Sequence, residues 1–154
     1  MPEIFLSKSE KETENIAFDF AKENKIKFGD IVALYGDLGA GKTAFTRGLV
    51  KFFSPVSRVT SPTFSLVNEY KIDNKKILHF DMYRINSEDD LLSVGFYDYL
   101  DGINEKIIII EWFDKIADFF GENTINIQII KVGRGDPGAP CENEREIIYA
   151  YTWD

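Results

Sequence analysis

The stretch that decides the fold is Ile31–Val50, IVALYGDLGAGKTAFTRGLV, in which a glycine-rich turn joins two apolar segments. The first segment, Ile31–Tyr35, is a continuous apolar run, which is typical of a buried parallel strand. The second segment, Ala44–Val50, carries large apolar residues at positions 45, 49 and 50, the spacing of one helical face. The stretch therefore predicts a strand, a tight turn and a helix that starts directly after the turn.

The turn matches the phosphate-binding pattern G-x-x-x-x-G-K-[ST]. Glycines let backbone N–H groups close around a phosphate where a side chain would block the approach, and the helix start adds unpaired N–H donors. The lysine of such a loop reaches the β- and γ-phosphates, and the hydroxyl that follows it binds Mg²⁺. The motif therefore predicts a nucleoside triphosphate site formed by Gly36, Asp37, Leu38, Gly39, Ala40, Gly41, Lys42, Thr43 and Ala44.

Composition narrows the class of protein. The 154 residues suggest one domain spanning 1–154, and the formal net charge of −8 argues against direct nucleic-acid binding, which needs a basic patch. Cys141 is the only cysteine, which excludes an internal disulfide and fits a reducing compartment. No apolar stretch approaches a membrane span and no signal-peptide pattern is present, so we expect a cytoplasmic protein without membrane contact.

The rest of the chain alternates strand and helix patterns, which predicts an α/β fold: a P-loop NTPase-like mixed, mostly parallel sheet with an antiparallel hairpin and flanking helices. Apolar runs predict further strands, and Ser-x-x-acid capping boxes predict helix starts. The expected strands are Glu3–Leu6, Ile107–Ile110 and Ile125–Val132, the capping boxes are Ser9–Glu12 and Ser87–Asp90, and Phe113–Phe120 is expected to be a short helix.

Turn residues predict a hairpin and an exposed loop. Phe64–Tyr70 and Lys76–Tyr83 are expected to pair as an antiparallel hairpin because Asp73-Asn74 between them is a turn signal. Residues 133–145 contain a cluster of glycine and proline, which predicts an exposed loop or insertion. We expect residues 146–153 to form a final edge strand.

Two carboxylates follow predicted strands and are candidates for the chemistry. Asp81 ends the apolar run Ile77–Phe80, and Glu111 ends Ile107–Ile110. Open α/β sheets bind ligands at the carboxyl ends of their strands, so both acids can face the glycine-rich turn. One carboxylate would hold Mg²⁺ while the other orients the attacking water, and the residues alone do not decide which does which. The simpler alternative is that either acid caps its strand or pairs with Arg84.

Three other residues or segments have both a functional and a structural interpretation. Ser61-Pro62-Thr63 stands where a switch loop would sense a γ-phosphate, although an ordinary turn explains it equally well. Trp112 follows Glu111, and by alternation its ring points away from the acid or turns out as the strand ends; a buried core tryptophan is slightly favoured over a functional one. His79 is the only histidine and has no cysteine or histidine companion, which argues against a metal site there.

The four motifs, in this order and spacing, resemble the bacterial TsaE (YjeE) ATPases of tRNA threonylcarbamoyladenosine (t6A) biosynthesis, over nearly the whole chain. The resemblance implies a Mg²⁺-dependent ATPase that acts with the tRNA threonylcarbamoyltransferase subunit and that subunit's inactive paralogue, and that does not transfer the group itself. The motifs that carry the resemblance are Gly36–Thr43, Ser61–Val67, His79–Arg84 and Glu111-Trp112.

The resemblance also implies a role for each site residue. Lys42 would contact the phosphates, Thr43 and Glu111 would hold Mg²⁺, and Asp81 would be the acid required for hydrolysis, near or on the metal. Ser61 and Thr63 would belong to the first switch, and Trp112 would be functional rather than part of the core.

The chain departs from the family pattern at three places. Phe113–Lys115 follow Glu-Trp where the family commonly has an arginine, and Ala44 replaces a second threonine. The family often has Gly-Arg before its last strand, on the adenine side of the nucleotide. Arg134 has that dipeptide here, but Arg145 stands directly before the predicted final strand, and we therefore favour Arg145.

Two further functions use the same loop. A small-molecule kinase is one, although no arginine-rich lid segment is visible. An interaction module in which ATP is a switch ligand and hydrolysis is incidental is the other. A GTPase is disfavoured because 74–77 lacks the aspartate of the guanine signature. No arginine can be assigned as a finger in cis, although Arg47, Arg58 and Arg84 are candidates, so we expect hydrolysis to be slow alone and faster with partners.

Overall fold

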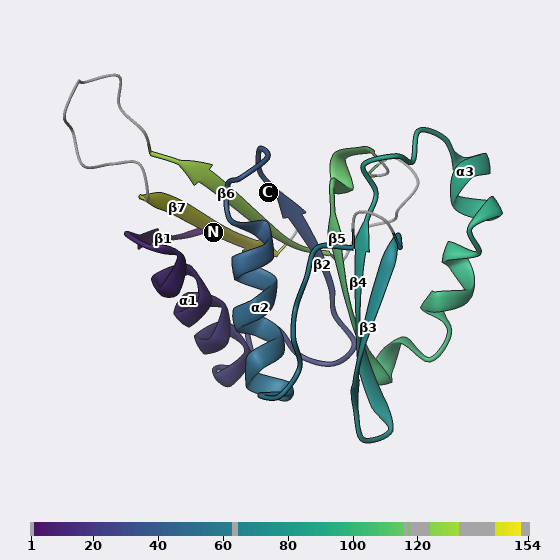
Figure 1. The fold of residues 1–154 in the computed structure, drawn as a ribbon, viewed down its shortest axis with the longest axis horizontal. Helices are drawn as coiled ribbons and strands as arrows, with labels where there is room; N and C mark the ends of the chain where they lie inside the picture. Colours follow the sequence, from purple (N-terminus) through teal and green to yellow (C-terminus); the bar gives the residue numbers. More distant parts are fainter. Residues whose placement is uncertain (1, 63–64, 116, 118–123, 133–143, 152–154) are drawn as a thin grey trace.

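The computed structural model describes residues 2–62, 65–115, 117, 124–132 and 144–151. These residues form a seven-stranded sheet with the strand order β1-β7-β6-β2-β5-β4-β3 (Figure 1). The strands are β1 (Glu3–Ser7), β2 (Ile31–Tyr35), β3 (Val67–Ile72), β4 (Lys75–Asp81), β5 (Lys106–Glu111), β6 (Ile125–Lys131) and β7 (Arg145–Tyr151).

Most strands of the sheet run in one direction. β2 pairs in parallel with both β5 and β6, and β5 pairs in parallel with β4. β7 runs antiparallel to β6 and to β1, and β3 runs antiparallel to β4. Only β3 and β7 among the described strands therefore oppose the common direction. The predicted mixed, mostly parallel sheet with its β3–β4 hairpin is confirmed.

Helices cover the two faces of the sheet at different places. α1 (Glu10–Lys22) and α2 (Lys42–Phe53) lie side by side on one face, whereas α3 (Glu88–Ser93) lies on the other side of the β5-β4-β3 half (Figure 1). Short 3₁₀ turns complete the connections: η1 (Phe96–Leu100), η2 (Ile103–Glu105) and η3 (Phe113–Lys115). Among the described residues, none of the helices combines the length and apolar character that crossing a membrane would need.

Both predicted capping boxes start helices. The Ser9 hydroxyl accepts a hydrogen bond from the Glu12 backbone N–H at 3.1 Å, and the Ser87 hydroxyl accepts one from the Asp90 N–H at 3.2 Å. Each hydroxyl satisfies one of the backbone donors that a helix start leaves unpaired. These local contacts explain why α1 and α3 begin where the sequence predicts.

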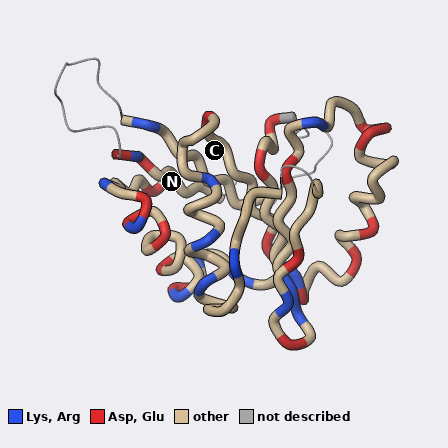
Figure 2. Tube along the Cα trace, viewed as in Figure 1, with Lys and Arg blue, Asp and Glu red and all other residues tan. Residues whose placement is uncertain are grey.

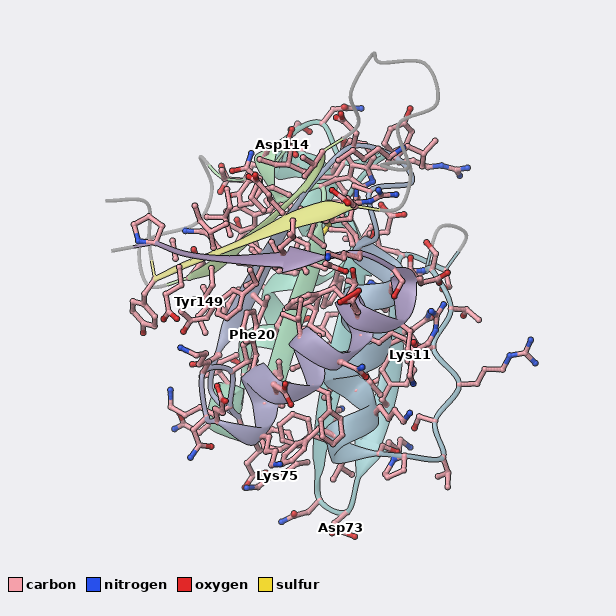
Figure 3. The ribbon with its side chains drawn as sticks, turned by 90° about the vertical axis from the view of Figure 1, so that its left-hand side faces the viewer. Lys11, Phe20, Asp73, Lys75, Asp114 and Tyr149 are labelled. Atoms are coloured by element: carbon pink, nitrogen blue, oxygen red, sulfur yellow. The ribbon has the colours of Figure 1, made fainter. Side chains whose placement is uncertain are left out.

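The run of isoleucines in β5 contributes to both hydrophobic clusters of the protein. Ile107 and Ile109 pack into the cluster between the sheet and α1–α2, and Ile108 and Ile110 pack into the cluster on the opposite face. Successive side chains of a strand point to opposite faces, so a strand covered on both sides needs apolar residues at every position. Figure 3 shows Phe20 between α1 and the sheet, where its ring lies edge-to-face with Tyr149 at 5.3 Å between centroids.

The structure corrects one prediction about the sheet. The last described strand, β7, is not an edge strand, because it lies between β1 and β6. The strand that begins the chain, β1, takes the edge instead, and position in the chain does not reveal position in the sheet.

The predicted helix Phe113–Phe120 begins as η3, but 116 and 118–120 lie outside the described residues, as do 133–143 of the predicted loop and 152–153 of the final strand.

The two helices that cover the first cluster depend on a glycine for their close approach. A Cβ built on Gly48 of α2 would lie 2.0 Å from the backbone oxygen of Glu14 in α1 and 2.6 Å from its carbonyl carbon. Both are backbone atoms, so relief would require α1 to move as a whole. Helix propensity alone would instead favour alanine over glycine, by about 1 kcal/mol.

We therefore predict that Gly48→Ala lowers the free energy of unfolding by about 2 kcal/mol or more, because overpacking outweighs the gain in propensity. Urea unfolding followed by circular dichroism measures the change. Lys51→Ala, an exposed position on the same helix, is the control and should change stability by less than about 0.5 kcal/mol. A Gly48→Ala chain that is more stable than the wild type would contradict the predicted clash.

Candidate functional site

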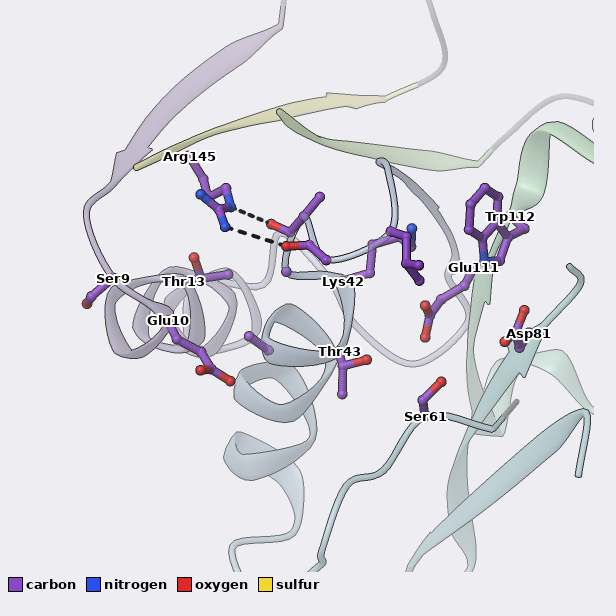
Figure 4. A pocket seen from close by; sticks show the side chains of 15 residues that line it. Ser9, Glu10, Thr13, Lys42, Thr43, Ser61, Asp81, Glu111, Trp112 and Arg145 are labelled. Atoms are coloured by element: carbon purple, nitrogen blue, oxygen red, sulfur yellow. Dashed lines mark hydrogen bonds between the residues drawn. The ribbon is translucent and has the colours of Figure 1, made fainter. Parts of the chain in front are cut away.

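A cleft of about 520 Å³ opens at the carboxyl ends of β2, β4 and β5 (Figure 4). It gathers residues from six separate parts of the chain: the start of α1, the glycine-rich turn with α2, the segment before β3, the end of β4, the end of β5, and the start of β7. The lining consists of Ser9, Glu10, Thr13, Leu38, Gly39, Ala40, Gly41, Lys42, Thr43, Ala44, Ser61, Asp81, Glu111, Trp112 and Arg145. Most of the residues predicted from the sequence therefore meet in one place.

The glycine-rich turn has the backbone shape that its residues suggest. Gly39 and Gly41 have φ values of 79° and 115°, in the region that favours glycine. Gly41 is also the N-cap of α2, and no side chain caps that helix start. α2 has no acidic residue in its first turn either. The N–H groups and the positive dipole end of α2 therefore stand ready for an anion.

Lys42 lies at the centre of the cleft, held by neutral partners. Its ammonium donates to the backbone oxygen of Gly36 and to that of Asp37, the latter at 3.3 Å, and it lies 4.2 Å from the centroid of the Trp112 ring. Burial lowers the pKa of Lys42, although the nearby carboxylates of Glu111 and Asp81 act in the opposite direction. The net direction indicates an ammonium whose charge is not fully compensated, and a phosphate would supply that compensation.

The two predicted strand-end carboxylates are neighbours. Asp81 and Glu111 are paired in the register of the parallel strands β4 and β5, and both are mostly buried, at 8% and 4% exposed. Asp81 accepts a hydrogen bond from the Tyr83 backbone N–H at 3.0 Å. Both acids line the cleft together with Lys42 and Thr43 (Figure 4). Within the described ranges, no group of three or more His, Cys, Asp or Glu residues could hold a metal by itself.

Trp112 does not point away from Glu111 as strand alternation suggests. Its backbone turns to a φ of 61° directly after β5, and this left-handed conformation breaks the alternation. The ring lines the cleft, lies over the Lys42 ammonium and meets the Tyr83 ring edge-to-face at 5.1 Å between centroids. Trp112 is half-buried and also packs against the second hydrophobic cluster, so its ring belongs to both the core and the cleft, and a functional role for Trp112 stays a prediction.

Arg145 reaches the glycine-rich turn from the first residue of β7. Its Nε donates to the Ala40 oxygen at 2.9 Å and its Nη2 to the Gly39 oxygen at 3.5 Å (Figure 4). These two hydrogen bonds hold the peptide planes of the turn in place. They therefore also fix the direction in which its N–H groups point. The sequence pattern identified Arg145 as a site residue but did not indicate this contact.

Sequence reasoning missed the contribution of α1. Ser9, Glu10 and Thr13 line the end of the cleft where Arg145 lies, away from Asp81 and Trp112 (Figure 4). The capping box located the start of this helix, but nothing local in the sequence shows which part of the molecule that start faces. The contact of the His79 ring with Glu111 was missed as well, and its geometry is described below.

A few predicted residues lie elsewhere. Gly36 and Asp37 line a smaller neighbouring cavity of about 260 Å³ together with Lys131, rather than the main cleft. A Cβ on Gly36 would lie 2.9 Å from the Ile129 oxygen, so Gly36 serves the close packing of the turn on β6. Thr63, Arg134 and Cys141 lie outside the described residues, and Ser61 is exposed at the cleft margin.

Comparisons with known proteins agree on one family. Residues 7–136 match the family model described as threonylcarbamoyl adenosine biosynthesis protein TsaE. The tRNA threonylcarbamoyladenosine biosynthesis protein TsaE of Rickettsia typhi is 43% identical over 122 residues, which cover 79% of this chain and 81% of that protein. The Bacillus subtilis protein of the same name is 33% identical over 123 residues, covering 80% of this chain and 70% of its own.

A solved structure shares the fold. The crystal structure of YdiB from Bacillus subtilis superposes with a TM-score of 0.74 and 27% sequence identity, covering 98% of this chain and 86% of that one. The similarity in structure therefore extends over nearly the whole chain, and the family match over residues 7–136 includes β2, β4 and β5, whose carboxyl ends form the cleft.

The contact of Arg145 with the turn leads to a testable expectation. Arg145→Met should weaken inorganic pyrophosphate or ATP binding about tenfold, because the turn loses two hydrogen bonds from a charged donor that hold its peptide planes. Isothermal titration calorimetry measures the affinity. Arg58→Met removes the same charge from an exposed position outside the lining and should bind within about twofold of the wild type. Equal weakening in both variants would assign the effect to net charge rather than to the contact.

Proposed function

The chain belongs to the TsaE family of threonylcarbamoyl adenosine biosynthesis proteins, and from this premise we propose that it binds and hydrolyses ATP with Mg²⁺ as an accessory step in forming t6A in tRNA. The observation that carries the proposal is the meeting of Lys42, Thr43, Asp81 and Glu111 around one cleft beside an uncapped helix start. A phosphate-binding loop alone would support only nucleotide binding. The two carboxylates beside it support hydrolysis.

The cleft suits a nucleoside triphosphate in one orientation. Its Lys42 end offers an ammonium and the N–H groups of the α2 start, which complement the β- and γ-phosphates. Its other end is formed by α1 and Arg145, and would receive the ribose and base. In this orientation the γ-phosphate points toward Asp81 and Glu111, on the side where hydrolysis requires acids.

The residues present also fit a magnesium ion. Mg²⁺ prefers oxygen ligands and is usually held by one or two protein groups together with phosphate oxygens and waters. Thr43 offers a hydroxyl and Glu111 a carboxylate, and Asp81 stands beside Glu111. The lack of a complete side-chain metal cage among the described residues agrees with a site that the nucleotide completes. When bound, the ion would neutralise charge on the β- and γ-phosphate oxygens.

The residues of the chain would act in a definite order. Lys42 exchanges its backbone carbonyl partners for phosphate oxygens when ATP enters. Asp81 uses one oxygen for the Tyr83 N–H and has the other available to accept a hydrogen bond from the attacking water. As the water oxygen bonds to the γ-phosphorus, the bond to the bridging oxygen breaks, ADP leaves with that oxygen, and the proton that the water loses passes by way of Asp81 to the phosphate that is released. Glu111, a magnesium ligand, takes no proton in this scheme.

Partner stimulation follows from the shortage of cations around the cleft. Lys42 and Arg145 are the only lysine or arginine residues in its described lining, and Arg145 bonds the turn. Arg47 forms ion pairs with Glu10 at 3.0 Å and Glu14 at 3.4 Å. The other described arginines, Arg58 and Arg84, do not line the cleft, so its described lining offers no arginine besides Arg145 to stabilise the charge that develops in the transition state. We propose that the complex with the transferase subunit and its inactive paralogue accelerates hydrolysis, as an arginine finger in trans does.

The surface charge is compatible with protein partners rather than tRNA. Residues 88–105, which include α3 and η1, contain acidic side chains and no lysine or arginine (Figure 2). Such a segment repels nucleic acid and complements a basic protein surface. Contact with the tRNA would then be left to the partners.

Two substitutions separate binding from hydrolysis. Lys42→Ala should weaken ATP binding strongly, whereas Asp81→Asn should keep ATP affinity within about threefold and reduce the hydrolysis rate by roughly 10²–10³, the usual loss of one preorganised transition-state contact. Calorimetry and phosphate release measure the two quantities. Loss of ATP binding in Asp81→Asn would make Asp81 a structural residue.

The partner requirement is tested by phosphate release from ATP with the chain alone and with both partner proteins. We expect at least a tenfold faster rate with the partners, and none of that increase with Asp81→Asn. An equal rate with and without partners would contradict the stimulation.

Transfer of the labelled γ-phosphate to a metabolite would favour a small-molecule kinase. Full t6A formation with Glu111→Ala, which should not hydrolyse ATP, would favour the ATP-switched interaction module.

A further inference from the structure

The single histidine of the chain lies beside the site, and the proposed hydrolysis does not use it directly. His79 is in β4, fully buried, and its register neighbours are Asn68 of β3 and Ile109 of β5. Side chains two residues apart in a strand share a face, so His79 lies on the same face as Asp81. Ile109 on this face packs with the α1–α2 cluster, which places His79 on the side of the sheet where the glycine-rich turn lies.

Among the described residues, the His79 ring has one polar contact. Its Nε2 donates to Oε2 of Glu111 at 2.5 Å. A carboxylate has no proton to give, so the ring nitrogen is the donor. Glu111 lines the cleft and His79 does not, which means that the histidine contacts the carboxylate from the protein interior. The contact occupies one oxygen of Glu111 and leaves the other for the cleft.

Filling the core does not explain this histidine. Its second nitrogen, Nδ1, has no hydrogen-bond partner within the part of the chain that the structure describes. A buried polar atom without a partner costs free energy, and a leucine or phenylalanine in its place would avoid that cost. The contact with Glu111 is what the histidine provides and an apolar residue would not.

We propose that His79 is a positioning residue that holds the Glu111 carboxylate in the orientation that binds Mg²⁺ beside the nucleotide. This rests on the proposed function, in which Glu111 is a magnesium ligand. A glutamate side chain has several rotatable bonds, and fixing it before the metal arrives removes an ordering cost from binding. Removing a partner that orients a metal ligand typically costs 10–100-fold in metal affinity or activity.

Four single substitutions and one double variant test the contact. His79→Leu removes the donor and keeps a buried apolar side chain. His79→Gln keeps an N–H donor with a reach close to that of Nε2, whereas His79→Asn has similar polarity but is one methylene too short. Glu111→Gln, alone and combined with His79→Leu, removes the charge on which the histidine is proposed to act. Urea unfolding of every variant accompanies the binding measurements.

The readout is the affinity for a non-hydrolysable ATP analogue, measured by calorimetry over a series of Mg²⁺ concentrations. Without Mg²⁺, we expect His79→Leu to bind the analogue with an affinity within about twofold of the wild type. The Mg²⁺ concentration that gives half of the magnesium-dependent increase in affinity should be roughly 10–100-fold higher in His79→Leu than in the wild type. His79→Gln should need a Mg²⁺ concentration close to that of the wild type, whereas His79→Asn should need a concentration close to that of His79→Leu. Adding His79→Leu to Glu111→Gln should change the requirement no further, because the two residues act as one unit.

Several outcomes would overturn the role of His79. One is an equal Mg²⁺ requirement in the wild type and His79→Leu. Another is a loss of analogue affinity that is the same with and without Mg²⁺, which would make the residue structural. If His79→Leu does not fold, the comparison of His79→Gln with His79→Asn decides, and an equal requirement in those two overturns the role.

Failure of the proposed function gives a different result. A wild-type chain that binds the analogue equally well with and without Mg²⁺ would show that the magnesium site itself is wrong, and the role of His79 would fall with it. A wild-type chain that responds to Mg²⁺ while His79→Leu responds equally would overturn only the positioning role.

Discussion

The parallel pairing of β4 and β5 beside β2 is the constraint on which the site depends. It brings Asp81 opposite Glu111, and Glu111 opposite Leu34, one residue before the end of the strand that leads into the glycine-rich turn. A shift of β5 by one residue against its neighbours would turn Glu111 toward the opposite hydrophobic cluster and Ile110 toward the cleft. Such a shift is strongly disfavoured because it would bury the Glu111 carboxylate among apolar side chains. The packing of the core therefore specifies the spacing of the functional groups.

The charges around the turn depend on the same geometry. Lys42 is drawn into a partly buried place where its partners are backbone oxygens and the face of Trp112, with two carboxylates nearby. Burial lowers its pKa despite those carboxylates, and an incoming phosphate would restore a strong partner. His79 contacts Glu111 from the protein interior. Arg145 contacts the backbone of the glycine-rich turn at the margin of the cleft. Both contacts orient groups that would touch the nucleotide or its metal, and such preorganisation is what catalysis at a phosphate requires.

How much of this could be predicted from the sequence depended on the range of the interaction. The strand, turn and helix of Ile31–Val50 follow from local patterns, as do the capping boxes and the hairpin. The acids Asp81 and Glu111 could be identified because the carboxyl ends of parallel strands meet at one edge of a sheet. Their arrival in one cleft with Lys42 agrees with that expectation, while their roles stay proposals.

What the sequence could not reveal were contacts between distant elements and departures from regular strand geometry. The place of β7 inside the sheet depends on its pairing with β1, at the other end of the chain. Trp112 turns toward the cleft through a positive φ that no residue pattern signals. From the sequence, His79 is a lone histidine in a strand, and only the register of β4 and β5 brings it to Glu111.

The most direct measurement is a crystal structure of the chain with Mg²⁺ and a non-hydrolysable ATP analogue. We predict phosphates within Gly36–Thr43 and a metal bound by Thr43 and Glu111, whereas a nucleotide bound elsewhere, or a metal held without either residue, would contradict the proposed site.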